Sequence, residues 1–553
     1  MIRRCSHQRQ QRQQGHHVEN KRRCYGDAES GRMKNPVRAQ NLLSNVLSLG
    51  GGETLARVVA FFGTAYLARV LGPEGFGLVG FATAVCGYLA LSNWALNDIG
   101  AREVAKTPRE AGVVGASVIA VKLLLATTGW LILVLVFPLL GLPQEARPVI
   151  LFAGLLLFAM AMDGGWILKG LEQSRMVGVA QVLGQILFVA LVFLLVHAPV
   201  DIAFAPLAQF IGEFAAALLL GVWIFHAHRP RIDWRRGFSV LRAAGFLIVS
   251  RLFRALIFSF DVLLLGFLLT QQDVGLYTAP YRVVFLLLAI AVAIYAAYLP
   301  AYTRAAELKD GQLSDLVNRS LELAAAAGIP LAVGGMVLAE PLLTLLFGSA
   351  YAGGAGAFRW LLLGVAVIFL YSGARNVLIV LGQTRTDLAL VATAAAINVA
   401  LNCWVIPRYG IEGAALVTAL SESLILVGVL WVVRRVGVNV QLSRLARPLL
   451  AALIMAAVLL YAVPGLPLGL KLVLGCATYA ASLLMLGGVP EDARPWLHTI
   501  GIAAGTTGYN KRKAKLIALQ QQEIDDNPRK SSDSQYPPGV TDHSRGHAWK
   551  QDQ

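Results

Sequence analysis

The feature that most constrains this chain is the recurrence of apolar segments of about 20 residues or more between residues 41 and 488. Each is long enough to cross a hydrocarbon core of about 30 Å as a helix, and turns rich in Gly, Pro and charge separate them. Lipid offers no water to backbone N–H and C=O groups, and a barrel strand needs only about ten alternating residues. The sequence therefore predicts an all-α integral membrane protein with about fourteen transmembrane helices.

Composition excludes a soluble domain. Hydrophobic residues make up 56% of the 553 residues and charged residues only 14%, whereas an ordinary soluble domain carries about a quarter charged residues. We place the spans at 41–70, 74–100, 111–140, 147–168, 177–197, 202–225, 238–269, 274–300, 316–347, 357–381, 388–406, 411–433, 445–463 and 468–486.

Lys and Arg are distributed unevenly over the short loops between these spans. Alternate loops are rich in them, and the remaining loops hold only Arg69, Arg147, Arg359, Arg408 and Lys471. Because Lys and Arg resist translocation, the basic loops should face the cytoplasm, and an even number of spans places both termini there as well. The net charge of +16 has the same origin, so we do not expect nucleic-acid binding.

The two ends of the chain lack apolar periodicity. Residues 1–40 are rich in Gln and Arg, and residues 489–553 become polar and contain Pro, Ser and Asp. This composition is typical of disordered cytoplasmic tails. Met33, which the first span follows closely, is an alternative start to Met1.

Catalytic motifs are missing from the sequence. It contains no GxxxxGK[ST], HExxH or GxSxG pattern, and no Cys and His spacing of a standard metal site. We therefore expect neither an enzyme nor an ATP-driven pump within this chain, and neither a cofactor nor a metal.

Several motifs resemble those of a known family. They are ARVLGPEGFGLV at 68–79, VGLYTAPYRVV at 274–284, LPAYTR at 299–304, LFGSAYAGG at 346–354, GQTRTDL at 382–388 and NVALNCWVIPRYGIEGAALVTALSE at 398–422. In order and spacing they resemble the polysaccharide transporter family, the Wzx-type flippases of lipid-linked oligosaccharides, in the superfamily that also contains the MATE exporters. The resemblance covers about residues 40–490. It rests on glycines and prolines at helix ends, so it carries over no substrate-contacting residue.

The resemblance implies two pseudo-symmetric lobes of six helices around a central cavity, open to one side at a time. The expected organisation is a tail at 1–40, an N-terminal lobe at 41–236, a C-terminal lobe at 237–434, two further helices at 435–488 and a tail at 489–553. The implied substrate is an oligosaccharide on a polyprenyl diphosphate, moved across the cytoplasmic (inner) membrane for O-antigen, capsule or exopolysaccharide assembly. A polymerase and glycosyltransferases would be partners.

Charged residues inside the spans are the candidate site. Each is expensive at a helix centre, by roughly 2.5 to 3.5 kcal/mol, so such residues usually face a cavity or a partner. Guanidinium groups suit a diphosphate, and the candidates for a cationic cavity are Arg57, Arg251, Arg254, Arg282 and Arg375. The alternative is that these arginines neutralise nearby acids, with Glu53 holding Arg57 and Asp261 holding Arg254.

Buried acids in the same spans raise the question of ion coupling. Asp163, Asp261 or Glu213 could couple transport to a proton or sodium gradient, or could simply pair with the arginines. Two other functions stay open: a MATE-like small-molecule exporter, which should present carboxylates in its cavity, and a membrane-embedded glycan polymerase or transferase, which should carry a large external loop.

An internal repeat follows from two similar segments. Phe76-Gly77-Leu78 and Val274-Gly275-Leu276 lie 198 positions apart, each after the first span of its half. A parallel repeat, related by an axis along the membrane normal, would produce this spacing. It predicts that Arg57 and Arg254 face each other across the cavity.

Overall fold

The computed structural model describes residues 36–136, 146–308, 312–490 and 492. The chain divides into two compact units, Met1–Gly488 and Val489–Gln553, and the account below concerns the first. The first helix begins at Pro36, five residues before the start predicted for the first span. The predicted disordered tails lie outside the described residues, apart from 36–40 and the few residues after 488.

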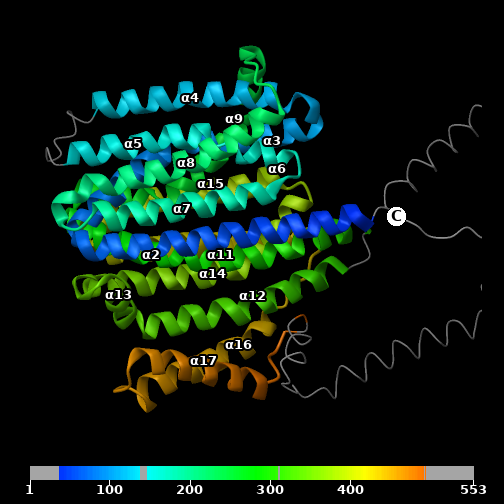
Figure 1. Cartoon of the computed structure of the whole chain (residues 1–553). Coiled ribbons are helices and arrows are strands. Elements are labelled where there is room, and N and C mark those ends of the chain that lie inside the picture. Colours follow the sequence, from blue (N-terminus) through cyan, green and yellow to red (C-terminus); the bar gives the residue numbers. More distant parts are fainter. Residues whose placement is uncertain (1–35, 137–145, 309–311, 491, 493–553) are drawn as a thin grey trace, which may run out of the picture. The chain divides into compact units, whose positions relative to one another are not determined.

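Helices and short connections make up the described residues, which contain no strand, as the apolar pattern predicted (Figure 1). The α-helices are α2 (Pro36–Leu89), α3 (Leu91–Lys106), α4 (Ala111–Val136), α5 (Ala146–Met162), α6 (Gly165–Gly170), α7 (Ser174–Leu195), α8 (Phe204–Ala227), α9 (Trp234–Phe258), α10 (Phe260–Leu268), α11 (Gln271–Leu308), α12 (Gln312–Val337), α13 (Ala339–Phe347), α14 (Ala355–Val380), α15 (Thr384–Arg435), α16 (Ala446–Ala457) and α17 (Leu468–Met485). Short helical turns η2 (Pro108–Glu110), η4 (Pro199–Ala203) and η5 (Ser349–Gly354) join some of them.

Eleven helices in the described residues are long and apolar enough to cross a membrane. Two of these, α2 and α15, each contain one glycine with non-helical dihedral angles, Gly72 and Gly410. Both have positive φ, 66° and 55°, a backbone conformation that glycine adopts without strain. Dividing α2 and α15 there, and counting α9 with α10, would give the expected number, but the count of fourteen stays a prediction.

The chain reverses direction at Gly72. Glu53, before this glycine, contacts Lys169 at the end of α6. Ala101, well after it, lies against the same end of α6, because a methyl group added at Gly170 would be 2.6 Å from the Ala101 carbonyl oxygen. Both arms therefore return to one end of the bundle.

Gly410 makes an equivalent hairpin of α15. Asn398 donates a hydrogen bond to Ser421 across the hairpin at 3.0 Å. Further from the turn, a methyl group at Gly428 would be 2.6 Å from the Leu390 side chain. The two arms therefore run antiparallel, as two consecutive spans must.

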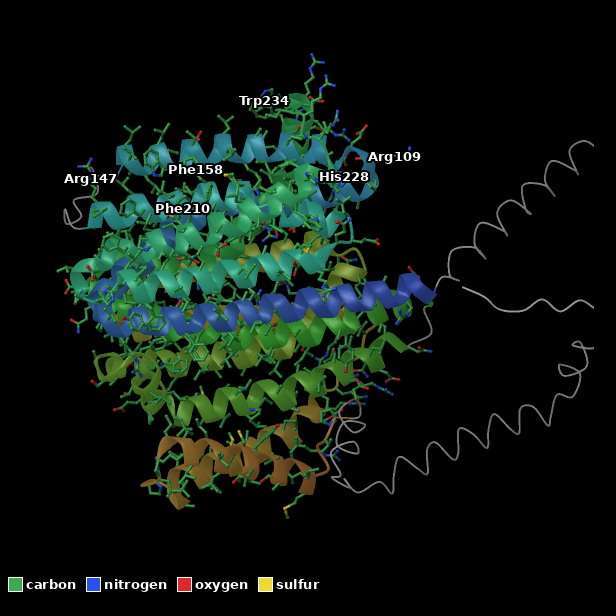
Figure 2. The ribbon with its side chains drawn as sticks, viewed as in Figure 1. Arg109, Arg147, Phe158, Phe210, His228 and Trp234 are labelled. Atoms are coloured by element: carbon green, nitrogen blue, oxygen red, sulfur yellow. The ribbon has the colours of Figure 1, made fainter. Side chains whose placement is uncertain are left out.

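The two classes of loops lie at opposite ends of the helices. Arg109 and His228 are at one end and Arg147 is at the other (Figure 2). At the first end, Arg236 near the start of α9 pairs with Glu110 of η2. The alternation of basic and less basic loops in the sequence thus corresponds to two ends of the bundle, which we call the basic end and the opposite end.

The first two spans meet the seventh and eighth at the opposite end, through the two glycines of the predicted repeat. A methyl group at Gly77 would lie 1.9 Å from the Gln271 carbonyl oxygen, and one at Gly275 would lie 1.8 Å from the Pro73 carbonyl oxygen. Gln271 stands 198 positions after Pro73, as Gly275 does after Gly77. Each motif therefore packs its glycine on the same position of the other, which is the reciprocal contact of a two-fold axis.

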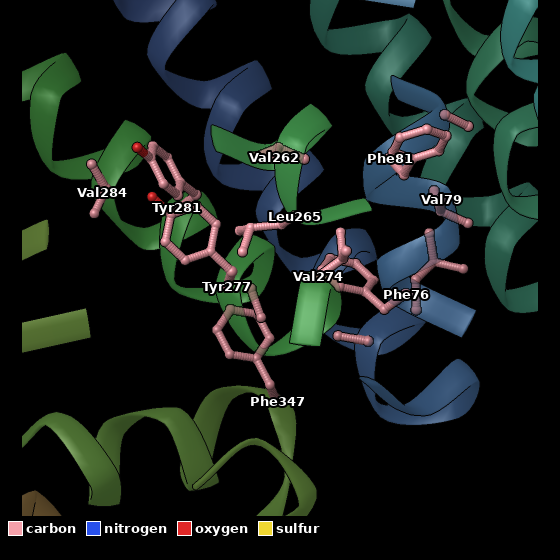
Figure 3. Close-up of a cluster of buried hydrophobic side chains, with 14 of the residues drawn as sticks. Phe76, Val79, Phe81, Val262, Leu265, Val274, Tyr277, Tyr281, Val284 and Phe347 are labelled. Atoms are coloured by element: carbon pink, nitrogen blue, oxygen red, sulfur yellow. The ribbon is translucent and has the colours of Figure 1, made fainter. Parts of the chain in front are cut away.

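A single apolar cluster surrounds this crossing (Figure 3). It joins Phe76 and Phe81 of α2 to Val274 and Tyr277 of α11, and to Phe347 at the end of α13. All five side chains are almost completely buried. The opposite end of the bundle is consequently closed by well-packed contacts.

Helix α9 contacts both predicted lobes. Near its start, Asp233 donates a backbone hydrogen bond to Ser117 of α4 at 2.8 Å. Later in the helix, Arg254 pairs with Asp387 of α15. Domain boundaries at 41–236 and 237–434 therefore stay predictions.

The last two helices, α16 and α17, lie beside α12 (Figure 1). Tyr479 of α17 donates a hydrogen bond to the Ala326 carbonyl of α12 at 2.8 Å, and Ala452 of α16 packs with Ile329. They extend the bundle on one flank.

Candidate functional site

Breaks in two helices position charged side chains inside the bundle. Asp163 lies in the non-helical step between α5 and α6, where its Oδ1 accepts a hydrogen bond from the Gly165 backbone at 2.9 Å. An aspartate that binds a nearby backbone N–H, followed by two glycines, weakens the helix at this point. A second break, at Ser259, separates α9 from α10 and precedes Asp261.

A cavity of about 620 Å³ lies among α2, α3, α5, α6, α7, α8 and α9, and we call it the polar hollow. A second cavity of about 420 Å³ adjoins it at the basic end and shares Trp94, Asn97, Asp163, Lys169, Gln181 and Arg251 with it. All residues that line the two cavities come from before residue 236, except Arg251 of α9.

The lining of these cavities corrects one expectation. It carries three cations and four carboxylates: Arg57, Lys169, Arg251, Glu53, Asp98, Asp163 and Glu213. A cationic majority is therefore wrong for these two cavities. The reason is that a cation removed from bulk water is costly unless an acid pairs with it, and the acids that pair here come from other helices.

Most of these charges have partners. Lys169 Nζ lies 2.9 Å from Glu53 Oε1, and Arg251 lies 2.5 Å from Asp98. The predicted alternative in which Glu53 holds Arg57 is wrong, because Glu53 binds Lys169.

Arg57 occupies the junction between the polar hollow and a third cavity of about 430 Å³ between α2 and α11. The third cavity, which we call the apolar hollow, is lined mainly by hydrophobic side chains, including Phe61, Phe285 and Val292. Arg282 also lines it. Within the described part of the chain, neither Arg57 nor Arg282 has a hydrogen-bond or ion-pair partner.

Arg254 and Arg375 are held elsewhere. Arg375 binds Asp387 through two nitrogens, at 2.6 Å and 2.8 Å, and Arg254 reaches the same carboxylate at 3.3 Å. Neither arginine lines the polar or the apolar hollow. The expectation that Arg254 faces Arg57 across the cavity is therefore wrong in this conformation, and so is the pairing of Arg254 with Asp261.

The three acids predicted for ion coupling fall into two places. Asp163 and Glu213 line the polar hollow, where Glu213 accepts a hydrogen bond from Gln185 at 2.8 Å. Asp261 is completely buried away from it and accepts hydrogen bonds from the hydroxyls of Tyr277, Tyr281 and Thr418.

Sequence reasoning missed several residues of this site. Trp94 is not among the predicted site residues, yet it lines both polar cavities with 39% of its surface exposed. Lys122 is completely buried and donates to Asn97 at 2.8 Å and to the Asp163 carbonyl at 3.5 Å. Asp387 lies inside the quoted GQTRTDL segment, where an acid at the start of a span, 12 positions after Arg375, was a usable signal.

Comparisons with known proteins support the resemblance. Residues 42–306 match the family described as polysaccharide biosynthesis protein. A relative from Haloferax volcanii, named a probable low-salt glycan biosynthesis flippase, is 21% identical over 412 residues, which are 72% of this chain and 85% of the relative.

Solved structures show the same fold. The lipid II flippase MurJ in an inward closed conformation superposes with a TM-score of 0.65 at 15% identity, over 78% of this chain and 97% of MurJ. An inward-facing MATE-family multidrug resistance transporter superposes with a TM-score of 0.52 at 17% identity, over 72% and 98%. The predicted resemblance and the helical MATE-like fold are confirmed. The relative and the two solved structures are themselves named a flippase or a transporter.

Proposed function

We propose that this chain, which has the fold of the MATE-like flippases and resembles the polysaccharide transporter family, is a flippase for a polyprenyl-diphosphate-linked oligosaccharide. It would move this lipid across the cytoplasmic membrane by alternating access, for O-antigen, capsule or exopolysaccharide assembly. A polymerase and the glycosyltransferases of the same pathway would supply and consume the substrate.

The observation that carries the proposal is the position of Arg57. It lies between a polar hollow of about 620 Å³ and an apolar hollow of about 430 Å³, and no acid among the described residues neutralises it. A lipid diphosphate has an anionic group between a polar sugar and an apolar chain. The order polar, cationic, apolar in the cavity matches the order of parts in this amphiphile.

Each part of the substrate has a chemically suited surface. Trp94, Asn97 and Gln181 offer an aromatic face and amide groups to a sugar. Arg57 and Arg282 both line the apolar hollow and suit a diphosphate, because a guanidinium group donates two parallel hydrogen bonds to phosphate oxygens.

The other predicted arginines would act differently. Arg251 lines the polar hollow and could bind the substrate in place of its present ion-pair partner Asp98. The side chain of Asp98 is 46% exposed, so water can solvate it when the pair opens. Arg254 and Arg375 share Asp387 and line neither the polar nor the apolar hollow, so we assign them to another stage of the cycle.

Loading would occur from the basic end. The polar hollow includes Lys169, next to a basic loop, whereas the Gly77–Gly275 crossing closes the opposite end. Because basic loops resist translocation, we assign the basic end and both termini to the cytoplasm. The substrate would then enter from the cytoplasmic leaflet and leave after the crossing opens.

Asp163 and Glu213 would sense the coupling ion, proton or sodium, because they line the polar hollow together. Asp261 could bind the coupling ion only if the hydroxyl groups that now donate hydrogen bonds to it moved away.

A second function is favoured by one observation. Four carboxylates line the two polar cavities, and this is what a MATE-like exporter of cationic molecules should present. The apolar hollow opposes that function, because Arg57 and Arg282, which have no ion-pair partner in the part of the chain that the structure describes, would repel a cationic molecule there.

A vesicle assay separates the two. The purified full chain is reconstituted, and a polyprenyl-diphosphate-linked oligosaccharide with a fluorescent sugar is compared with a fluorescent lipophilic cation. We expect a membrane-impermeant quencher to reveal movement of the lipid-linked sugar alone. Movement of the cation without the lipid-linked sugar would establish the exporter instead.

A further inference from the structure

Glu422 is a completely buried acid that the proposed transport path does not use. It lies in the second arm of α15, and none of its surface is exposed. One carboxyl oxygen, Oε2, accepts a hydrogen bond from the Tyr371 hydroxyl of α14 at 2.7 Å. The other, Oε1, is buried and has no hydrogen-bond partner among the residues that the structure describes.

An ionised carboxylate would be poorly satisfied in this place. Two carboxylate oxygens offer about four acceptor sites, and Glu422 receives one hydrogen bond. An ionised group without direct partners is far more costly to bury than a neutral one, and such groups usually take up a proton. The Tyr371 hydroxyl can donate to a neutral carboxylic acid as well as to a carboxylate.

A charged cluster lies one helical turn from Tyr371. Arg375, on the same face of α14, binds Asp387 through two nitrogens, and Arg254 of α9 shares that carboxylate. The charge of Arg375 also acts on Glu422. Two guanidinium groups therefore share one carboxylate, which leaves one positive charge in excess.

The cluster connects Glu422 to water. The side chains of Arg375 and Asp387 are 13% and 10% exposed, whereas that of Arg254, the member on α9, is 37% exposed. The cluster therefore reaches from the buried acid to a partly exposed guanidinium group.

The remaining acid near this part of α15 is separately satisfied. Thr418, one turn before Glu422, donates to Asp261 of α10 at 3.3 Å, and Tyr277 and Tyr281 of α11 donate to the same carboxylate. Asp261 therefore has four hydrogen bonds, including one from the Val262 backbone at 2.7 Å. Of Asp261 and Glu422, therefore, Glu422 is the acid that has a carboxyl oxygen without a hydrogen-bond partner among the described residues.

We propose that Glu422 is a proton-binding site that controls the charge of the Arg254–Asp387–Arg375 cluster. In this conformation Glu422 is a neutral carboxylic acid and the cluster has one excess positive charge. When the O–H bond breaks, the proton passes to water and the electron pair stays on the carboxylate. The new negative charge then compensates the excess of the cluster.

A consequence for anions rests on the proposed function. With Glu422 protonated, Arg254 and Arg375 together attract an anion such as a diphosphate. With Glu422 ionised, that attraction is lost. Proton binding and anion binding in the C-terminal half are therefore linked.

Infrared spectroscopy tests the proton site without any substrate. Difference spectra of the purified full chain between acidic and alkaline buffer report the carbonyl band of protonated carboxylic acids. We expect Glu422→Gln to remove one such band and Tyr371→Phe to shift it, because the hydrogen bond from the hydroxyl is lost. Glu412→Gln is the matched control, since Glu412 is an exposed acid on the same arm of α15.

The proposal depends on the assignment of the titrating carbonyl band to Glu422. If Glu422→Gln, with helical content and elution volume unchanged, leaves the titrating band intact, Glu422 holds no exchangeable proton and the proposal is overturned. This result is independent of whether the chain moves a lipid-linked oligosaccharide.

The link to anions is tested with inorganic pyrophosphate as the probe. We expect wild type and Glu412→Gln to bind it at least about tenfold more weakly after Glu422 ionises, and Glu422→Gln to show no such change. A pH response retained in Glu422→Gln, a response to sodium instead of pH, or no pyrophosphate binding at any pH would overturn the link.

Discussion

Arg254 and Arg375 both contact Asp387, whereas Arg57 has no ion pair among the described residues. The sequence could identify all three as intramembrane charges, since each lies inside an apolar run. It could not identify their partners, because Asp387 is 133 positions from Arg254 along the chain. Partner choice depends on how helices pack, and the local spacing of Glu53 and Arg57 pointed to a pair that does not form.

At the residue scale, Arg57→Ala should reduce transport of a lipid-linked oligosaccharide by roughly tenfold to a hundredfold, because charge-assisted hydrogen bonds contribute about 1.5 to 3 kcal/mol. Arg57→Lys should restore part of the activity, since it keeps the charge and loses the planar fork. Initial transport rates in vesicles measure both. Arg408→Ala is the control, because Arg408 stacks on Trp404 at the opposite end of the bundle.

Arg254→Ala should reduce transport less than Arg57→Ala does. Asp387 keeps both contacts with Arg375, so the loss leaves no buried acid without a partner. The same vesicle assay compares the two variants. A larger loss for Arg254→Ala than for Arg57→Ala would mean that the C-terminal half binds the diphosphate first.

At the element scale, helix type and most span positions were predictable, since long apolar runs in lipid permit little else. The interruptions at Asp163 and Ser259 were not predicted, although Asp163 and the two glycines after it are a local sequence signal for the first of them. The repeat was predictable from the 198-residue spacing, and its two glycines do meet. The spacing did not predict where the neighbouring arginines point, since repeats share a backbone path and not side-chain partners.

The glycine crossing gives a stability prediction. Gly77→Ala should lower the free energy of unfolding by about 1 to 3 kcal/mol, because the added methyl group would overlap the Gln271 carbonyl oxygen. Thermal unfolding of the purified protein measures the change. Gly87→Ala is the control in the same helix, because nothing lies within 4 Å of a methyl group there.

The two variants should differ in sign. Alanine favours helix over glycine by up to about 1 kcal/mol, so Gly87→Ala should be neutral or stabilising. Equal melting temperatures for Gly77→Ala and wild type would show that the crossing is looser than described.

At the scale of the whole molecule, the basic end and the opposite end define a topology. We expect a cysteine at Arg235 to react with a membrane-impermeant maleimide only from the cytoplasm, and a cysteine at Gln271 only from outside. Both are placed in a background without the five native cysteines, because Cys403 and Cys476 are free and exposed. Reaction of position 235 in intact cells would reverse the assigned orientation.

The most direct test of the central claim is to map which part of a bound substrate lies in each hollow. A photo-cross-linking amino acid is placed at Gln181 in the polar hollow or at Phe285 in the apolar hollow, and the adducts with a polyprenyl-diphosphate-linked oligosaccharide are identified by mass spectrometry. The account predicts sugar adducts at position 181 and prenyl adducts at position 285, both reduced by Arg57→Ala. Prenyl adducts at position 181, or no adducts at either position while the chain still transports the lipid, would contradict it.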